Sequence, residues 1–464
     1  MILYESEIEQ CTLELLRDES GYNLAYGPDL LEGLAPERVY NEVVLKGRLK
    51  AAIDKFNPDI PISAREEALK KVLRTESLTL IDNNQAFHRY LTEGVDVKFG
   101  VGEGKSRTDK VWLIDFDHPE NNDFLAVNQY TVVESKSVPP YAPTNKRPDI
   151  VLFINGLPLV VIELKNAADE KADLQAAYRQ LQTYHQKIPS LFKYTAFEVI
   201  SDAWFAKIGT LTSDYSRFME WKSVDGVRVV DSKHEAELEP LVRGLLNKRT
   251  LLDVIRHFIV FENAKERTLK KIAAYHQYFA VNKAIRSTLR ASAEQTSHFV
   301  AEHPAVYGLP NAEDQPKGDR RAGVIWHTQG SGKSLTMVWL TKWIREYNPN
   351  GRVLIITDRE ELDEQIEKVY KGVSENIYRT KKVIFAQRVM NALIEKGLAR
   401  EEAYDTVQPV AMKAWGEGLD YQELLAQNDK VMALLTRSEL DACFTLDYYF
   451  SQVDYIYRRN GIEG

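Results

Sequence analysis

The sequence predicts an α/β fold over about its first 380 residues, with a small all-helical segment after it. Three observations predict this. β-rich apolar runs separated by Asn, Pro and Gly turns occupy residues 95–165, between helical patterns. A strand–loop–helix–strand pattern, typical of the start of a parallel sheet, covers residues 322–358. From about residue 383 onward the pattern is helical throughout. A chain of 464 residues is too long for one core, so two to four domains are expected.

In the first half of the chain, helical patterns flank a group of strands. Residues 1–25 have the apolar stripe of a helix, and residues 30–90 are mostly helical in pattern. The β-rich runs that follow lie at 111–116, 124–133, 149–154 and 157–165. A further helix is expected over 169–187, and short strands over 193–232. This order predicts an α/β sandwich built around a mixed sheet.

Two carboxylates lie on neighbouring strands of that predicted sheet. Asp149 opens one strand, Glu163 closes the next, and Asn155-Gly156 between them is a strong signal for a type I′ hairpin. Such a turn brings the carboxylates near each other, and paired carboxylates bind a hard cation such as Mg²⁺. Lys165 shares a strand face with Glu163, where it can position water and stabilise charge on a phosphate. An isolated E-x-K triplet is commonly a solvated strand edge, but carboxylates that end two buried strands are costly unless something pairs them.

The following helix and the first helix add possible members to this site. Gln180 and Tyr184 are four residues apart, so one helix face presents both to the strand that carries Glu163. An amide and a phenol there can contact a DNA backbone or brace the metal ligands. Glu9 is either a further acidic member of the site or part of a solvated helix face.

Together these residues match the PD-(D/E)xK nuclease pattern with its Q-x-x-x-Y extension. The stretch RPDIVLFINGLPLVVIELKNA, and the chain from residue 1 to about 382, resembles the restriction (R) subunits of type I restriction–modification enzymes. The resemblance implies that Asp149, Glu163 and Lys165 are catalytic, that the two carboxylates hold Mg²⁺, and that Gln180 and Tyr184 are accessory residues.

A second motif, His327-Thr-Gln-Gly-Ser-Gly-Lys-Ser334, follows a buried strand and opens a helix, as a P-loop does. Backbone N–H groups at such a turn cradle phosphates, Lys333 reaches the β- and γ-phosphates, and the Ser334 hydroxyl ligates Mg²⁺. His327 stands where the common pattern has Gly, a variation found in superfamily 2 helicases. The expected ATP-binding residues of the motif are Thr328, Gly330, Ser331, Gly332, Lys333 and Ser334.

Two neighbours resemble further parts of a superfamily 2 helicase. Gln277 is similar to the glutamine that reads the adenine edge, with an ordinary polar helix residue as the alternative interpretation. Arg359, in the segment after the second strand, is similar to a motif that contacts the DNA backbone. No apolar strand that ends in Asp-Glu follows Lys333, so only an incomplete RecA-like lobe is expected, without autonomous ATP hydrolysis.

From about residue 383 to 461 the sequence resembles the C-terminal helical domain of bacterial adenylosuccinate lyase instead. The resemblance implies a small bundle and no lyase activity, because the catalytic loops of that family are absent. Apolar and aromatic side chains of the expected core are Phe385, Val389, Leu393, Trp415, Phe444, Tyr448 and Tyr449. The chain therefore resembles a chimera joined near Lys381-Lys382, through a natural fusion, an engineered fusion or an error of sequence assembly.

The expected domains are a nuclease (1–232), a helical connector (233–310), the start of a motor lobe (311–382) and a lyase-like helical segment (383–464). The expected function is a Mg²⁺-dependent DNA endonuclease subunit of a type I system with an ATP-binding, helicase-like motor. Its expected partners are double-stranded DNA and the specificity and methyltransferase subunits. Two cysteines without metal-ligand spacing, no secretion signal and no apolar run near 18 residues favour a cytoplasmic protein that does not span a membrane.

Two alternatives stay open. The chain is either an active nuclease or a catalytically incomplete R-subunit remnant that binds DNA or ATP, and the complete P-D…E-x-K set favours the nuclease. An adenylosuccinate lyase fragment rests on the last segment alone. The net charge of −8 is not that of an obvious nucleic-acid binder, so any DNA contact requires a local basic groove.

Overall fold

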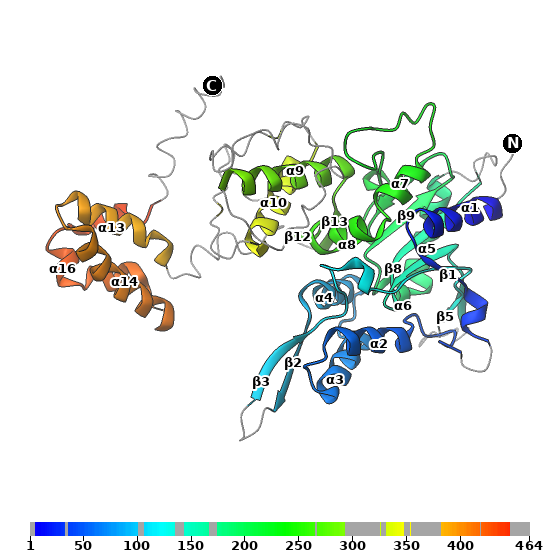
Figure 1. Ribbon diagram of the computed structural model, residues 1–464, viewed down its shortest axis with the longest axis horizontal. Coiled ribbons are helices and arrows are strands. Elements are labelled where there is room, and N and C mark those ends of the chain that lie inside the picture. Colours follow the sequence, from blue (N-terminus) through cyan, green and yellow to red (C-terminus); the bar gives the residue numbers. More distant parts are fainter. Residues whose placement is uncertain are drawn as a thin grey trace. The chain divides into compact units, whose positions relative to one another are not determined.

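The computed structural model divides the chain into two compact units, residues 1–369 and 370–464, and each is described separately. Elements are labelled as in Figure 1. The residues that the structure describes are 5–32, 36–100, 106–134, 143–166, 174–264, 267–292, 325, 331–347, 353, 382–417 and 419–445.

A seven-stranded mixed sheet is the centre of the first unit, which confirms the predicted mixed α/β architecture. Its strands, in spatial order, are β1 (Asn23–Tyr26), β4 (Phe124–Asn128), β7 (Ile150–Ile154), β8 (Leu157–Leu164), β9 (Phe197–Ser201), β10 (Ala206–Gly209) and β11 (Met219–Glu220). The pairs β1–β4 and β8–β9 are parallel, and the other neighbouring pairs are antiparallel. Every residue of β7 and β8 is buried, as expected of central strands that are covered on both faces.

Two helices bring the candidate site residues to this sheet. α1 (Glu5–Asp18) contacts β1, β4 and β8, and α5 (Leu174–Lys187) contacts β8 and β9. Each is amphipathic, with an apolar stripe at helical spacing that is buried. The predictions of a helix at each of these places are confirmed within the described residues, although α1 ends at Asp18 and residues 23–26 form strand β1 instead of more helix.

The remaining elements of residues 1–232 surround the sheet. They are η1 (Gly27–Leu30), α2 (Lys46–Phe56), α3 (Ile62–Leu73), α4 (Leu80–Glu93), η2 (Pro119–Asn121), β5 (Val132–Glu134), β6 (Thr144–Lys146), α6 (Pro189–Phe192) and η3 (Tyr215–Arg217). β5 and β6 form a separate two-stranded sheet. The predicted helical character of residues 30–90 is confirmed by α2, α3 and α4.

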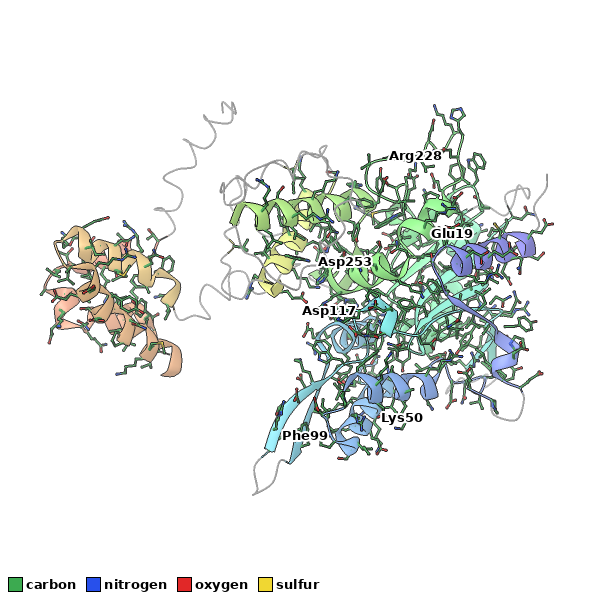
Figure 2. All side chains as sticks on the ribbon, viewed as in Figure 1. Glu19, Lys50, Phe99, Asp117, Arg228 and Asp253 are labelled. Atoms are coloured by element: carbon green, nitrogen blue, oxygen red, sulfur yellow. The ribbon has the colours of Figure 1, made fainter. Side chains whose placement is uncertain are left out.

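Two strand predictions in this part are wrong in detail. The run 111–116 is not a strand: only Val111 belongs to one, at the end of the hairpin β2 (Val95–Gly100) and β3 (Ser106–Val111). The backbone of Trp112 bonds to the side chain of Asn57 instead of to a neighbouring strand. The run 124–133 is interrupted after β4, where Gln129 adopts φ +55°. Figure 2 shows Phe99 on the part of the β2–β3 hairpin that extends beyond α3.

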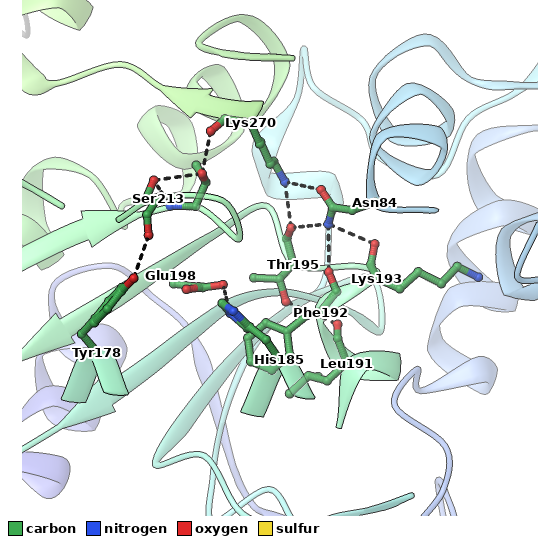
Figure 3. Close-up of polar contacts among 11 residues, drawn as sticks. Asn84, Tyr178, His185, Leu191, Phe192, Lys193, Thr195, Glu198, Ser213 and Lys270 are labelled. Atoms are coloured by element: carbon green, nitrogen blue, oxygen red, sulfur yellow. Dashed lines mark hydrogen bonds and ion pairs between the residues drawn. The ribbon is translucent and has the colours of Figure 1, made fainter. Parts of the chain in front are cut away.

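The predicted helical connector contains an unpredicted hairpin. Its helices are α7 (Leu238–Gly244), α8 (Lys248–His257) and α9 (Tyr275–Ser292), and β12 (Ile259–Ala264) pairs with β13 (Arg267–Ile272) between them. The fully buried Lys270 of β13 donates to Asn84 Oδ1 at 2.8 Å and to the Thr195 carbonyl at 2.9 Å (Figure 3). The connector is thus bonded to α4 and to the segment before β9.

Part of the predicted motor lobe is described. The expected helix is confirmed as α10 (Lys333–Tyr347), which packs on α9. The two expected strands, 322–326 and 352–358, lie outside the described residues except for Ile325 and Val353.

The second unit is helical, as predicted. It comprises η5 (Val383–Phe385), α13 (Ala386–Glu395), α14 (Arg400–Glu417), α15 (Tyr421–Ala426), α16 (Asp429–Met432) and α17 (Arg437–Ala442). The predicted core positions Phe385, Val389 and Leu393 are buried, and Phe444 packs partly buried against them. The side chain of Trp415 and residues 448–449 lie outside the described residues. Over the whole described chain, no helix combines the length and apolar character of a membrane span.

Candidate active site

A β-bulge sets which residues of β7 and β8 face each other. Asn155 and Gly156 both have positive φ, +51° and +79°, as the predicted type I′ turn requires. Ile154 pairs with Leu157, but the register shifts between Leu152 and Phe153, and Ile150 then pairs with Ile162. The same register continued by one residue places Asp149 opposite Glu163, so both carboxylates are on one face of the sheet.

Without the bulge this juxtaposition would be lost. A regular ladder from the Ile154–Leu157 pair would bring Asp149 opposite Ile162, and Glu163 would point to the other face because side chains alternate along a strand. The extra residue in β8 therefore places the Glu163 side chain on the same face of the sheet as Asp149. β-bulges next to active sites are known to redirect side chains in this way.

Glu163 is fully buried, Asp149 is half-buried, and the charge of Asp149 acts on Glu163. Asp149 Oδ2 accepts the Leu164 backbone N–H at 2.7 Å, and burial raises the pKa of Asp149 to about 6. Burial and then the nearby charge of Asp149 raise the pKa of Glu163, whose side chain is fully buried, to about 8. Burial is the main cause of both shifts, because removal from water disfavours the charged form of an acid.

Lys165 is the basic member of the site. Its Nζ donates to Glu163 Oε1 at 2.9 Å and to the Leu164 carbonyl at 2.7 Å, and it lies 3.6 Å from Glu5 Oε1. Burial alone would lower the pKa of Lys165, but the neighbouring carboxylates outweigh burial and the net shift is upward. Lys165 therefore stays an ammonium beside the carboxylate pair.

The carboxylate pair fits a divalent cation. Glu163 Oε2 is buried and has no hydrogen-bond partner among the described residues, whereas Lys165 donates to the other oxygen, Oε1, so a cation at Oε2 would compensate the cost of burying this oxygen. No group of three or more Asp, Glu, His or Cys side chains there is arranged to hold a metal. A set of one or two carboxylates, completed by waters and substrate oxygens, is nevertheless the usual ligand set of Mg²⁺.

Glu9 of α1 belongs to the surroundings of this pair, which argues against the solvated-face alternative. Asn128 Nδ2 donates to its Oε1 at 2.7 Å, and Gln129 Nε2 donates to its Oε2 at 2.8 Å. The Gln129 backbone N–H also donates to the Asp149 carbonyl at 3.0 Å. The charge of Glu9 contributes to the raised pKa of Asp149, after burial and the charge of Glu5. Sequence reasoning missed Asn128 and Gln129, which carry no motif.

Gln180 and Tyr184 lie together on α5, as predicted. Gln180 Nε2 donates to Tyr184 Oη at 2.7 Å, and Tyr184 Oη donates to the Arg147 carbonyl at 3.2 Å. Burial, followed by the charge of Glu163, raises the pKa of Tyr184. The phenol is therefore next to the carboxylates and fixes the segment that leads into Asp149.

Sequence reasoning also missed a basic cavity that Gln180 and Tyr184 help to line. The cavity of about 700 Å³ includes Lys146, Arg147 and Arg179 in its lining. The signal was present in the sequence, since Lys146-Arg147 directly precedes Pro148-Asp149.

The predicted nucleotide-binding segment is described from Ser331 onward. Gly332 has φ +78° and directly precedes α10, whose first residues are Lys333 and Ser334. Gln277 is buried, and its Nε2 donates to the carbonyls of Ser331 at 2.9 Å and of Gly332 at 3.2 Å. In this structure the Gln277 amide thus bonds to the backbone of the two residues that precede α10.

Three residues of the predicted sites, Thr328, Gly330 and Arg359, lie outside the described residues.

Comparisons with known proteins match two segments of the chain. Residues 2–217 match the family model described as type I restriction enzyme R protein N terminus. Residues 276–442 match the model described as SWI2/SNF2 ATPase, a match that extends across the join expected near Lys381-Lys382.

Curated relatives are similar to the chain over a longer stretch of its sequence. The chain is 36% identical over 424 residues to the type I restriction enzyme HindI endonuclease subunit of Haemophilus influenzae, covering 89% of this chain and 37% of that protein. It is 30% identical over 409 residues to the putative type I restriction enzyme MjaIXP endonuclease subunit of Methanocaldococcus jannaschii, covering 82% of this chain and 35% of that protein. The chain spans little more than a third of the length of these relatives. It is thus similar to type I restriction enzyme endonuclease subunits, over residues 2–217 to the R protein N terminus, with a region similar to SWI2/SNF2 ATPases at residues 276–442.

Proposed function

We propose that residues 1–232 form a Mg²⁺-dependent DNA endonuclease domain of the PD-(D/E)xK type. The observation that supports this most is the bulged hairpin, which brings Asp149 and Glu163 to one face with Lys165 bonded to Glu163. The similarity to type I restriction endonuclease subunits supports the same assignment.

Each residue of the set has a distinct role in this proposal. Asp149 and Glu163 hold the cation, which when bound lowers the pKa of a water and stabilises charge on the phosphate. The Lys165 ammonium orients the attacking water and offsets negative charge on the phosphate oxygens. Gln180 and Tyr184 support the segment between β6 and Asp149 through the Tyr184–Arg147 hydrogen bond.

The proposed biological setting is a type I restriction–modification system. The chain would act on double-stranded DNA together with specificity and methyltransferase subunits, a proposal supported by its similarity to endonuclease subunits of type I restriction enzymes. The region from Ser331 would bind ATP with Lys333 on the phosphates and Ser334 on Mg²⁺. Thr328 and Gly330 would complete the loop, Gln277 would contact adenine or the loop itself, and Arg359 would contact DNA. The second unit would be a lyase-like bundle without lyase activity, although the SWI2/SNF2 ATPase match extends through most of this unit to residue 442.

Plasmid cleavage tests the nuclease proposal. The full chain with supercoiled plasmid and Mg²⁺ is expected to nick or linearise the DNA, and Asp149→Ala is expected to abolish this. Glu66→Gln is the matched control, because it removes an exposed carboxylate from α3, away from the site. Equal activity of wild type and Asp149→Ala would favour the inactive remnant.

Nucleotide titration tests the ATP-binding proposal separately. A fluorescent ATP analogue is expected to bind the wild-type chain and to lose most of its affinity for Lys333→Ala, because the ammonium contacts the β- and γ-phosphates. The control is Arg345→Ala, at the exposed far end of the same helix. Unchanged binding by Lys333→Ala would exclude this segment as the ATP site.

A further inference from the structure

The basic cavity beside the candidate active site is large enough for a ligand. Its volume of about 700 Å³ falls within the range of about 300–1,000 Å³ typical of binding clefts. β6, the segment after it and one face of α5 form its walls. The residues that line it are Thr131, Asn145, Lys146, Arg147, Ala176, Arg179, Gln180, Thr183 and Tyr184.

The chemistry of this lining suits a phosphodiester backbone. Three of the nine lining residues are cationic, and none is acidic. Arg147 and Arg179 are exposed and Lys146 is half-buried, and within the described residues no ion pair involves Lys146 or Arg147. The Asn145 amide and the Thr131 hydroxyl supply further donors, whereas the Thr183 hydroxyl donates to the Arg179 carbonyl at 3.0 Å. Arg, Lys, Asn and Thr side chains are the groups that proteins use to contact phosphate and sugar without reading bases.

The position of the cavity connects it to the carboxylate pair. Gln180 and Tyr184 line the cavity, and the Tyr184 hydroxyl is held at 3.2 Å by the carbonyl of Arg147, two residues before Asp149. The charge of Glu163 also acts on the Tyr184 phenol, where it contributes to the raised pKa after burial. Tyr184 thus lines the cavity and is also close to the carboxylate pair.

We propose that this cavity binds the backbone phosphates of the cleaved DNA strand next to the scissile bond, with Lys146, Arg147 and Arg179 neutralising them. The inference rests on the proposed nuclease function. It adds to the carboxylate pair a surface that binds the DNA strand. It also explains how a chain with a net charge of −8 holds DNA: three cations are concentrated where the strand must pass. Because these groups contact the backbone alone, binding here is independent of base sequence.

Binding measured without cleavage tests the cavity apart from catalysis. The full chain carrying Asp149→Asn is titrated, with Ca²⁺ in place of Mg²⁺, against a fluorescent 20-base-pair duplex of arbitrary sequence. Adding Lys146→Ala and Arg147→Ala together is expected to weaken binding at least tenfold for duplexes of any sequence. The slope of log affinity against log salt should fall by about 0.9 for each phosphate that the variant no longer neutralises.

Matched variants separate loss of charge from loss of fold. Arg217→Ala is the control, since it removes an exposed arginine from η3, near β11 at the edge of the sheet. Arg147→Lys should retain most of the binding, because it keeps the positive charge. Equal affinity of the double variant and the Arg217→Ala control would overturn the proposal, and so would the absence of duplex binding in the parent chain.

Two further outcomes distinguish the possible errors. Millimolar mononucleotide or inorganic phosphate that displaces the duplex through the same residues would identify a small-anion pocket and overturn the proposal. Duplex binding that depends on Lys146 and Arg147 in a chain whose cleavage does not depend on Asp149 would support the cavity while refuting the proposed nuclease function. The two ideas therefore fail separately.

Discussion

At the scale of single residues, the site holds negative charge at a cost to stability. Glu163 is fully buried with one oxygen unpartnered among the described residues, and Asp149 and Glu9 place further carboxylates beside it. Lys165 compensates only part of this charge. Sites that bind cations commonly trade stability for function in this way, because the charges that repel each other are those that the ligand needs.

Asp149→Asn is expected to stabilise the cation-free chain and to abolish cleavage. Asparagine keeps an oxygen that can accept the Leu164 N–H bond but removes the repulsion with Glu163, so the free energy of unfolding should rise by roughly 0.5–2 kcal/mol. Cleavage should fall at least about 100-fold. Thermal melts with and without Mg²⁺ check both parts: Mg²⁺ should raise the melting temperature of the wild type and not that of the variant. A variant that melts below the wild type without Mg²⁺ would contradict the argument.

At the scale of elements, the β7–β8 hairpin couples turn geometry to the site. Its turn is held from outside as well, because the Leu45 backbone N–H donates to the Gly156 carbonyl at 2.9 Å. A Cβ on Gly156 would lie 2.4 Å from the Leu45 carbonyl oxygen, and φ of +79° is unfavourable for any other residue. Glycine at 156 therefore allows both the turn and the close approach of the chain at the start of α2.

Gly156→Ala is expected to lower the free energy of unfolding by about 1–3 kcal/mol, through left-handed strain and displacement of the Leu45 segment. Gly47→Ala, in the neighbouring helix α2, is the matched control. A Cβ there meets nothing within 4 Å, and alanine in a helix should be neutral or stabilising by about 0.5–1 kcal/mol. Urea unfolding of both variants checks the difference, and equal stability would show that the turn tolerates a side chain.

The same elements show how far the sequence can be interpreted. Continuous apolar runs and Asn-Gly predicted β7, β8 and their turn, because these signals are local. The bulge that aligns Glu163 with Asp149 was not predictable, since it depends on how β8 pairs with both neighbours. The hairpin β12–β13 was missed because strand residues such as Lys270 and Lys271 break the apolar alternation. Lys146 and Arg147 were missed as cavity residues because only the fold brings α5 beside them.

At the scale of the first unit, a buried polar network joins segments that are far apart in the sequence. Lys270 of β13 bonds to Asn84 of α4, whose Nδ2 in turn donates to the carbonyls of Phe192, Lys193 and Thr195 (Figure 3). His88 lies beside this network, and burial lowers its pKa well below the usual value. Since Lys270 and Asn84 are buried, each needs its partner, and the network specifies how β13 packs on α4 and on the segment before β9.

Lys270 should make the stability of this unit depend on pH. Burial lowers the pKa of Lys270 to about 7 in the folded chain, whereas an unfolded lysine titrates near 10.5. Between these values the unfolded chain binds more protons, so the free energy of unfolding should rise with pH, by about 2 kcal/mol from pH 7.5 to 9.5.

Lys270→Met removes this dependence but leaves Asn84 Oδ1 without its donor, so the variant should be less stable at pH 9.5 and show a flatter profile. Lys271→Met, which removes a lysine paired with Glu262 on the same hairpin, is the control and should keep the wild-type slope. Urea unfolding at several pH values measures all three chains, and parallel profiles for wild type and Lys270→Met would show that Lys270 stays charged in the folded state.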